Sequence, residues 1–234
     1  MEVVTTSINT DEHDLLLGGT TVNKLSTQDF KDIIHVTIDS VIANEKYFCE
    51  LDSVAGDGDF GTSLASGFRA IESNWDSLDD GDIGKFLLSC SKILMTNCGG
   101  ASGPIWGNAL RKAGSYAKGT TSVNLQELAE LMDAMVAGVK KVGGAELGDK
   151  TLLDALIPAA KSLEESAEDG SELKEAIEKA VDKADEGAEN TKEIAAKKGR
   201  ARYLGDRSIG NYDPGAKAIS VLFNDIRDEL FSGE

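Results

Sequence analysis

An all-α fold of about eight helices is the structure that the sequence predicts. In eight segments, apolar residues recur three or four positions apart, which places them on one face of a helix. No segment alternates convincingly between apolar and polar residues, as a half-buried strand does. The connections are short, and neither a linker nor a change in composition divides the 234 residues. We therefore expect one helical domain over residues 26–234, preceded by a polar, loosely ordered extension over residues 1–25.

Each predicted helix in the first half of the chain has an apolar face and a recognisable boundary. Ser26 or Thr27 can cap the first helix, because a side-chain oxygen at this position accepts a hydrogen bond from a free backbone N–H. A run rich in glycine, residues 97–104, separates the third helix from the fourth. We expect these helices over residues 26–44, 62–75, 83–97 and 105–117.

The second half contains four more predicted helices. Asn124 and Glu127 have the spacing of a capping box at the start of the fifth helix. Asp213 followed by Pro214 indicates the start of the eighth, because proline is favoured in the first turn. The acidic stretch between them, residues 164–189, is most simply the solvated face of two amphipathic helices. We expect the four helices after Asn124, over residues 152–168, from Ser171 and after Asp213.

The composition limits the classes of partner. The net charge is −17 and 41% of the residues are hydrophobic, which is enough for a core. Such a charge argues against binding nucleic acid or an anionic membrane, although it leaves nucleotides possible because a divalent metal neutralises phosphates. The three cysteines are odd in number and lack metal-site spacing, so we expect reduced, partly buried thiols in a cytoplasmic protein. We expect neither a secretory signal nor a membrane span.

Three carboxylates within eight residues form the most informative segment. Asp52, Asp57 and Asp59 repel one another unless a cation lies between them, and the glycines of this segment let the backbone turn tightly. Oxygen ligands suit a hard cation such as Mg²⁺ or Ca²⁺. Ordinary turn chemistry is the alternative. An EF-hand is excluded, because Gly61 occupies its fifth position and no glutamate occupies its twelfth.

Small and polar residues concentrate in four connections, over residues 52–63, 97–104, 143–151 and 197–215. These connections follow the first, third, fifth and seventh predicted helices. If the helices alternate up and down, all four lie at the same end of the bundle. We therefore expect them to form one site.

The fourth connection carries five basic residues in an otherwise acidic chain: Lys197, Lys198, Arg200, Arg202 and Arg207. We expect it to contact phosphate, with a solvated surface loop as the alternative. A metal, a cation and glycine-rich backbone together are typical of phosphoryl transfer. The sequence lacks a Walker motif and the motifs of protein kinases. His13 and His35 lie outside the four connections, so a hydrolase triad has no obvious base.

Four motifs, in order along residues 26–231, resemble the nucleotide-binding subunit (DhaL type) of dihydroxyacetone kinases and the matching domain of the single-chain enzymes. They are Asp52-x4-Asp-Gly-Asp-Phe-Gly-Thr62, Gly99-Gly-Ala-Ser-Gly-Pro104, Gly148-Asp-Lys-Thr151 with Asp154, and Lys198-Gly-Arg-Ala-x-Tyr-Leu-Gly-x-Arg-Ser-Ile-Gly210 with Asp213-Pro-Gly215. The resemblance implies an antiparallel barrel of eight helices with the nucleotide, ADP or ATP, at one end.

The resemblance also implies a role for each matched residue. Asp52, Asp57 and Asp59 would hold two Mg²⁺ ions, and Arg200 would contact the transferring phosphate. Phe60 stands where some relatives carry His or Cys, which leaves only its backbone contact expected. The residues expected to contact the nucleotide are Phe60, Gly61, Thr62 and Ser63 at the phosphates, Ala101 and Ser102 beside them, Gly143 and Leu152 at the adenine, and Arg200 with Asp213, Pro214 and Gly215 around the pocket.

The partners follow from what this chain lacks. In the family, a separate substrate-binding subunit holds the ketose covalently on a histidine, and that region is absent here. We therefore expect a partner subunit carrying dihydroxyacetone or a related small ketose. ADP would be a tightly held cofactor recharged by a phosphotransferase-system protein, or ATP would exchange as a substrate; a free-standing subunit favours the first. The alternative function is a nucleotide-dependent co-regulator that signals phosphorylation state.

Overall fold

The computed structural model describes residues 23–231, and within them nearly all regular structure is helical. The described residues form two short strands, nine α-helices and three 3₁₀ helices. The strands and α-helices are β1 (Leu25–Ser26), α1 (Thr27–Ala43), α2 (Glu45–Ser53), α3 (Phe60–Ser73), α4 (Ile83–Asn97), α5 (Ser102–Tyr116), β2 (Ser122–Val123), α6 (Leu125–Gly143), α7 (Leu153–Glu168), α8 (Leu173–Asn190) and α9 (Pro214–Leu230). The 3₁₀ helices are Trp75–Ser77, Thr191–Glu193 and Ala201–Ser208. The eight predicted helices are confirmed, with predicted ends that differ from the observed ones by at most three residues.

Two features of the described residues differ from the prediction. The nine-residue helix α2 lies in the connection after the first predicted helix. Tyr47, Phe48 and Leu51 recur at helical spacing, but the helix is short and buries only Phe48, so this pattern covers too few residues to predict it. The strands β1 and β2 pair antiparallel, with Leu25 opposite Val123, and each is too short to alternate. Of the predicted N-terminal extension, residues 1–22 lie outside the described residues, whereas Leu25 is buried.

The predicted helix starts have the expected caps. The Ser26 hydroxyl accepts the Asp29 N–H, and the Asp29 carboxylate accepts the Ser26 N–H in return. Asn124 and Glu127 form the same reciprocal pair at α6. Asp213 accepts the Ala216 N–H at 2.8 Å before Pro214 begins α9. These bonds satisfy backbone donors that have no partner inside the helix.

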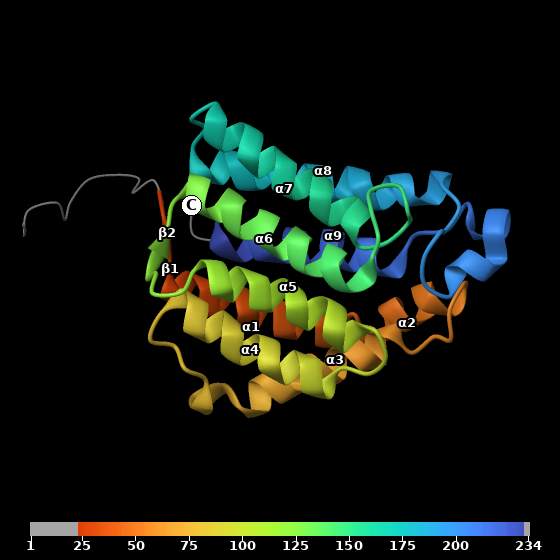
Figure 1. Ribbon diagram of the computed structural model, residues 1–234, viewed down its shortest axis with the longest axis horizontal. Coiled ribbons are helices and arrows are strands. Elements are labelled where there is room, and N and C mark those ends of the chain that lie inside the picture. Colours follow the sequence, from red (N-terminus) through yellow and green to blue (C-terminus); the bar gives the residue numbers. More distant parts are fainter. Residues whose placement is uncertain (1–22, 232–234) are drawn as a thin grey trace, which may run out of the picture.

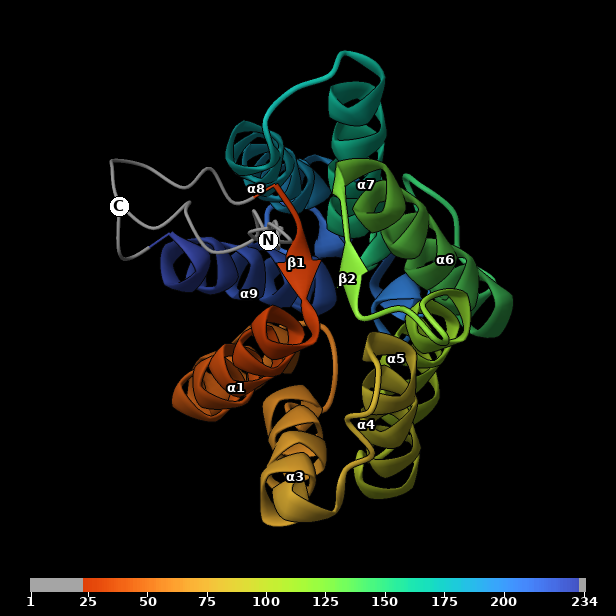
Figure 2. The ribbon, with the colours of Figure 1, turned by 90° about the vertical axis from the view of Figure 1, so that its left-hand side faces the viewer.

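Eight of the helices form a closed ring within residues 23–231. The order of contacts is α1, α3, α4, α5, α6, α7, α8 and α9, and α9 packs against α1 to close the ring. Figure 2 shows this ring end-on, with β1 and β2 across the end nearer the viewer. The opposite end, on the right in Figure 1, carries α2 and the connections that follow α2, α4, α6 and α8.

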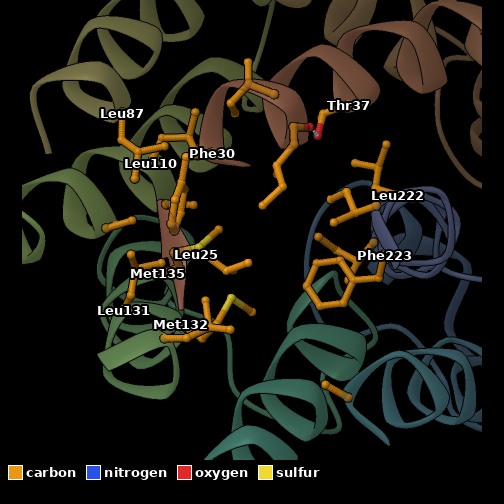
Figure 3. Close-up of a pocket in the computed structure, with 18 of the residues that line it drawn as sticks. Leu25, Phe30, Thr37, Leu87, Leu110, Leu131, Met132, Met135, Leu222 and Phe223 are labelled. Carbon is orange, nitrogen blue, oxygen red and sulfur yellow. Dashed lines mark hydrogen bonds between the residues drawn. The ribbon is translucent and has the colours of Figure 1, made fainter. Parts of the chain in front are cut away.

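The interior of the ring contains an apolar cavity of about 180 Å³. Side chains of all eight ring helices line it, including Phe30, Met132 and Phe223 (Figure 3). Thr37 is the one polar residue among the described lining residues, and its hydroxyl donates to the Ile33 carbonyl at 2.7 Å. None of the predicted site residues lines this cavity. The candidate site is therefore separate from this cavity and lies at the end of the ring.

No helix within the described residues has both the length and the hydropathy needed to cross a membrane.

Candidate functional site

Hydrogen bonds and an ion pair join the four predicted loops to one another at one end of the ring. The Ser63 hydroxyl donates to the Gly99 carbonyl at 2.9 Å, which connects the first loop to the second. Arg200 of the fourth loop pairs with Asp57 of the first. The Lys197 ammonium donates to the Gly148 carbonyl at 2.8 Å, which connects the fourth loop to the third. The predicted gathering of the four loops at one end is therefore what the structure shows (Figure 1).

The three aspartates of the first loop converge on one point. One carboxylate oxygen from each of Asp52, Asp57 and Asp59 lies within 4.8 Å of the other two. Asp52, in the last turn of α2, accepts the N–H groups of Gly58 and Asp59 at 2.9 and 3.2 Å, so its carboxylate organises the turn. A Cβ at Gly56 would lie 2.1 Å from an Asp52 oxygen, so a larger residue there would displace the Asp52 carboxylate.

The crowding of these carboxylates affects the pKa of Asp59. Partial desolvation raises the pKa of Asp59, and the neighbouring Asp57 raises it further through a hydrogen bond and through its charge. Arg200 acts in the opposite direction. Three carboxylates beside one guanidinium leave net negative charge at this point, which favours the binding of a cation.

Arg200 brings positive charge to the acidic loop. Its guanidinium pairs with the Asp57 carboxylate, and the same nitrogen lies 4.0 Å from an Asp59 oxygen. The Arg200 side chain is 64% exposed, so it remains accessible to a ligand. An accessible guanidinium beside a carboxylate cluster can bind phosphate oxygens while the cluster binds a metal.

Helix α3 begins directly at the acidic loop. Phe60 is its first residue and packs against Phe48 of α2, with ring centroids 6.0 Å apart. Gly61 is buried where α3 crosses α2, and a Cβ there would lie 2.0 Å from the Glu45 carbonyl oxygen. The Thr62 N–H points to the Cys49 sulfur at 3.3 Å. The sequence predicted this helix start at Thr62, two residues late, because Phe60 reads as part of the loop.

Helix α5 begins at the second loop. Ala101 is exposed at the N-cap position and Ser102 is the first helical residue. Neither makes a side-chain cap at this helix start. The Ser63–Gly99 bond holds the second loop beside the start of α3. The N-terminal ends of two helices therefore face the same region, and the partial positive charge of such ends favours anions.

The starts of α7 and α9 meet on the other side of the site. A Cβ at Gly215 would lie 3.1 Å from the Leu152 Cβ, so the turn over residues 213–215 lies directly against the buried Leu152. Desolvation raises the pKa of Asp213 to about 7, with a smaller contribution from the charge of Asp154. Gly143, at the end of α6, is exposed, with nothing within 4 Å of the position of a Cβ. The structure records no contact that joins Gly143 to the other predicted residues.

The sequence assigned no role to Lys150, although this residue belongs to the third motif. It is 4% exposed, and its ammonium donates to the backbone carbonyls of Thr191 and Ser208, on the segment between α8 and α9 that contains the fourth loop. Burial lowers the pKa of Lys150, and the carboxylates of Asp213 and Asp154 act against this shift. A lysine flanked by glycine, aspartate and threonine has the sequence of a surface loop, so burial here had no local signal.

Comparison with known proteins identifies the family. Residues 54–228, most of the chain, match the DAK2 domain. The chain belongs to the DAK2 domain family. Its relatives include the PEP-dependent dihydroxyacetone kinase 2, ADP-binding subunit DhaL, of Listeria innocua, which is 39% identical over 186 residues, covering 79% of this chain and 86% of the relative. The corresponding DhaL subunit of Escherichia coli is 36% identical over 177 residues, covering 76% and 84%. The resemblance to this family is thereby confirmed.

The fold of this DAK2 family member also occurs in a solved enzyme. The dihydroxyacetone kinase of C. freundii superposes with a TM-score of 0.68 at 24% identity, covering all of this chain and 38% of that protein. The complex of the same enzyme with AMP-PNP and Mg²⁺ superposes with a TM-score of 0.67. At this identity the likeness shows the fold alone, and it confirms the all-helical architecture.

Proposed function

We propose that this chain is the nucleotide-binding subunit of a dihydroxyacetone kinase, which transfers a phosphoryl group to dihydroxyacetone or a related small ketose held on a partner subunit. The observation that carries the proposal is the convergence of three carboxylates and Arg200 beside the start of α3. The names of the relatives, which describe ADP-binding subunits of such kinases, support it.

The donor set at the acidic loop fits Mg²⁺. Three carboxylates offer only oxygen ligands, which a hard divalent cation prefers. The glycine at position 56, where a Cβ would overlap Asp52, leaves the carboxylate free to turn inward. Asp52, Asp57 and Asp59 would hold the metal, two ions by family resemblance, and bound Mg²⁺ would neutralise charge on the nucleotide phosphates.

The remaining residues bind and orient the nucleotide. Phe60, Gly61, Thr62 and Ser63 contact the phosphates from the start of α3, and Ala101 and Ser102 approach them from the start of α5. Gly143 and Leu152 border the adenine, and the turn of Asp213, Pro214 and Gly215 completes the pocket. Arg200 contacts the transferring phosphate and offsets the charge that develops on its oxygens.

The partners are a substrate-binding subunit and a phosphotransferase-system phosphoryl donor. With these partners, ADP would be a permanently bound cofactor that the phosphoryl donor recharges. The subunit would then act in the cytoplasm between two protein partners. Cys90 and Cys98 are buried as free thiols, which agrees with a reducing compartment. Exchange of free ATP is the other mode.

The nucleotide content of the purified protein tests this proposal. Denaturation followed by chromatography should release about one ADP per chain. An empty protein that transfers phosphate from ATP, when mixed with a substrate-binding subunit, would support the exchange mode instead. A protein that neither retains nor binds an adenine nucleotide in Mg²⁺ contradicts the proposal.

A further inference from the structure

Lys150 is a buried lysine at the base of the loop that carries Arg200. It adopts a φ of 61°, the only positive φ of a residue other than glycine within residues 23–231. A residue other than glycine rarely adopts this backbone conformation unless the surrounding structure requires it. Lys150 is also one of the few charged residues in the described part of the chain that is less than a tenth exposed.

The Lys150 ammonium is surrounded by backbone carbonyl oxygens. It lies 2.8 Å from the Thr191 oxygen and 3.2 Å from that of Ile194. It lies 2.7 Å from each of the oxygens of Ser208 and Asn211. An ammonium has three N–H donors, which is one for each of the three shorter contacts. The more distant Ile194 oxygen can then only share a donor with one of the others. The first two carbonyls lie where the loop leaves α8, and the last two where it returns to α9.

Two carboxylates offset the buried charge. Asp154 and Asp213 both act on Lys150 from the starts of α7 and α9. Each carboxylate is itself held by backbone: Asp154 accepts the N–H groups of Gly148 and Thr151 at 2.6 and 2.7 Å, and Asp213 accepts that of Ala216 at 2.8 Å. A buried cation is stable in such a cluster because its donors and its charge are both satisfied.

The loop has little apolar packing of its own. Between Lys192 and Tyr212, only Ala196 and Ser208 are buried. Ser208 is held by polar contacts, accepting the Ala196 N–H at 2.9 Å and donating to the Gly205 carbonyl at 2.6 Å. The loop is therefore held by polar contacts, which are the bonds at its base, the bonds of Lys197 to Gly148 and Asp149, and the Arg200–Asp57 pair.

We propose that Lys150 is a positioning residue, whose ammonium clamps both ends of the loop over residues 191–211 and thereby holds Arg200 opposite Asp57. In effect, one buried cation takes the place of a hydrophobic core under this loop. The kinetic consequence rests on the function proposed above, whereas the structural consequence does not.

Hydrogen exchange tests the structural part. In Lys150→Met, amides over residues 192–211 should exchange at least tenfold faster in the nucleotide-free protein, while those of α1 and α4 keep their protection. Lys183→Met is the matched control, because the Lys183 ammonium pairs with the Glu186 side chain within α8, outside the loop. This control should leave the exchange of the loop unchanged. Unchanged loop exchange in Lys150→Met, or equally faster exchange in every helix, overturns the proposal.

A double-mutant cycle tests the action through Arg200. With the substrate-binding subunit and a phosphoryl donor present, Lys150→Met should lower kcat at least tenfold and change KM for the ketose less than threefold. In an Arg200→Ala background, Lys150→Met should lower kcat less than twofold further, because the group that it positions is gone. Equal losses in both backgrounds overturn the positioning role. If the wild-type chain shows no transfer at all, the proposed function fails, and the exchange experiment still decides the role of Lys150.

Lys150→Arg keeps the test decisive if Lys150→Met does not fold. Arginine retains the charge and donors, but its planar fork cannot direct three N–H groups from one tetrahedral nitrogen. We expect Lys150→Arg to fold, with a rate of loop exchange and a kcat between those of wild type and those expected for Lys150→Met. Wild-type values for both in Lys150→Arg would overturn the requirement for an ammonium.

Discussion

Arg200 and Asp57 form an ion pair although 143 residues separate them in the sequence. The pair joins the basic loop between α8 and α9 to the acidic loop between α2 and α3, and Asp59 lies 4.0 Å from the same guanidinium nitrogen. Both partners are accessible to solvent, with side chains 64% and 43% exposed. An exposed pair of this kind contributes little to stability, so its position at the site points to a role in binding.

Arg200 variants should separate transfer from nucleotide binding. Arg200→Lys keeps the charge and loses the planar fork, so it should lower the transfer rate more than the nucleotide affinity. Arg200→Ala should lower both, with a loss of transfer of about 10²- to 10³-fold, as for removal of one transition-state donor. The measurement is steady-state transfer in a reconstituted system with the substrate-binding subunit. Full activity of Arg200→Ala would mean that the basic loop is a solvated connection.

Removal of one acidic ligand should weaken the metal-dependent binding of the nucleotide. Asp57→Asn or Asp59→Asn should weaken ADP binding in Mg²⁺ about tenfold or more, because a carboxylate ligand becomes a weaker amide. The free energy of unfolding without ligand should stay the same or rise, because the carboxylates repel one another. Calorimetric titration with and without Mg²⁺ measures this, with Asp76→Asn, on the exposed turn after α3, as the control. Wild-type affinity in the site variants shows that the metal ligands are assigned wrongly.

Gly61 should be intolerant of a side chain because α3 crosses α2 there. A Cβ would lie 2.0 Å from the Glu45 carbonyl oxygen and 2.9 Å from the Cys49 nitrogen, both backbone atoms. Gly61→Ala should therefore lower the free energy of unfolding by about 1–3 kcal/mol, as for overpacking. Gly143→Ala, where nothing lies within 4 Å of the new Cβ, is the matched control, expected to change stability by less than about 0.5 kcal/mol. Urea denaturation compares the two, and equal stabilities would refute the close crossing.

Asp213 should make stability depend on pH. Its pKa is raised to about 7 in the folded chain from 3.8, chiefly by desolvation. The folded state therefore binds the proton more tightly, and the free energy of unfolding falls as pH rises between these values, by at most about 1.4 kcal/mol per pH unit. Asp213→Asn keeps a capping side chain and removes the titration.

Urea denaturation near about pH 5 and about pH 8 gives the comparison for Asp213. Wild type should lose stability relative to Asp213→Asn over this interval. A difference that is constant, or that grows in favour of wild type, contradicts the raised pKa.

Local patterns in the sequence predicted most of the fold. Each ring helix buries one continuous face, so its apolar residues recur at helical spacing, and capping residues such as Asn124 mark the ends. Helix α2 was not predicted because it is only nine residues long and buries only Phe48. The convergence of the three aspartates could be predicted because they lie within eight residues of the sequence. Lys150 was not, since its burial depends on carbonyls 41 to 61 residues away along the chain.

Thermal unfolding tests the central claim, a metal-bridged nucleotide site, most directly. A ligand that binds only the folded state stabilises it by about 2.7 kcal/mol at a hundredfold excess over its Kd. For a chain of this size that corresponds to a rise in Tm of about 5–10 °C. Mg²⁺ with ADP should produce such a rise, and ADP with EDTA a much smaller one. Equal rises with and without the metal, or no rise in either, would contradict the account.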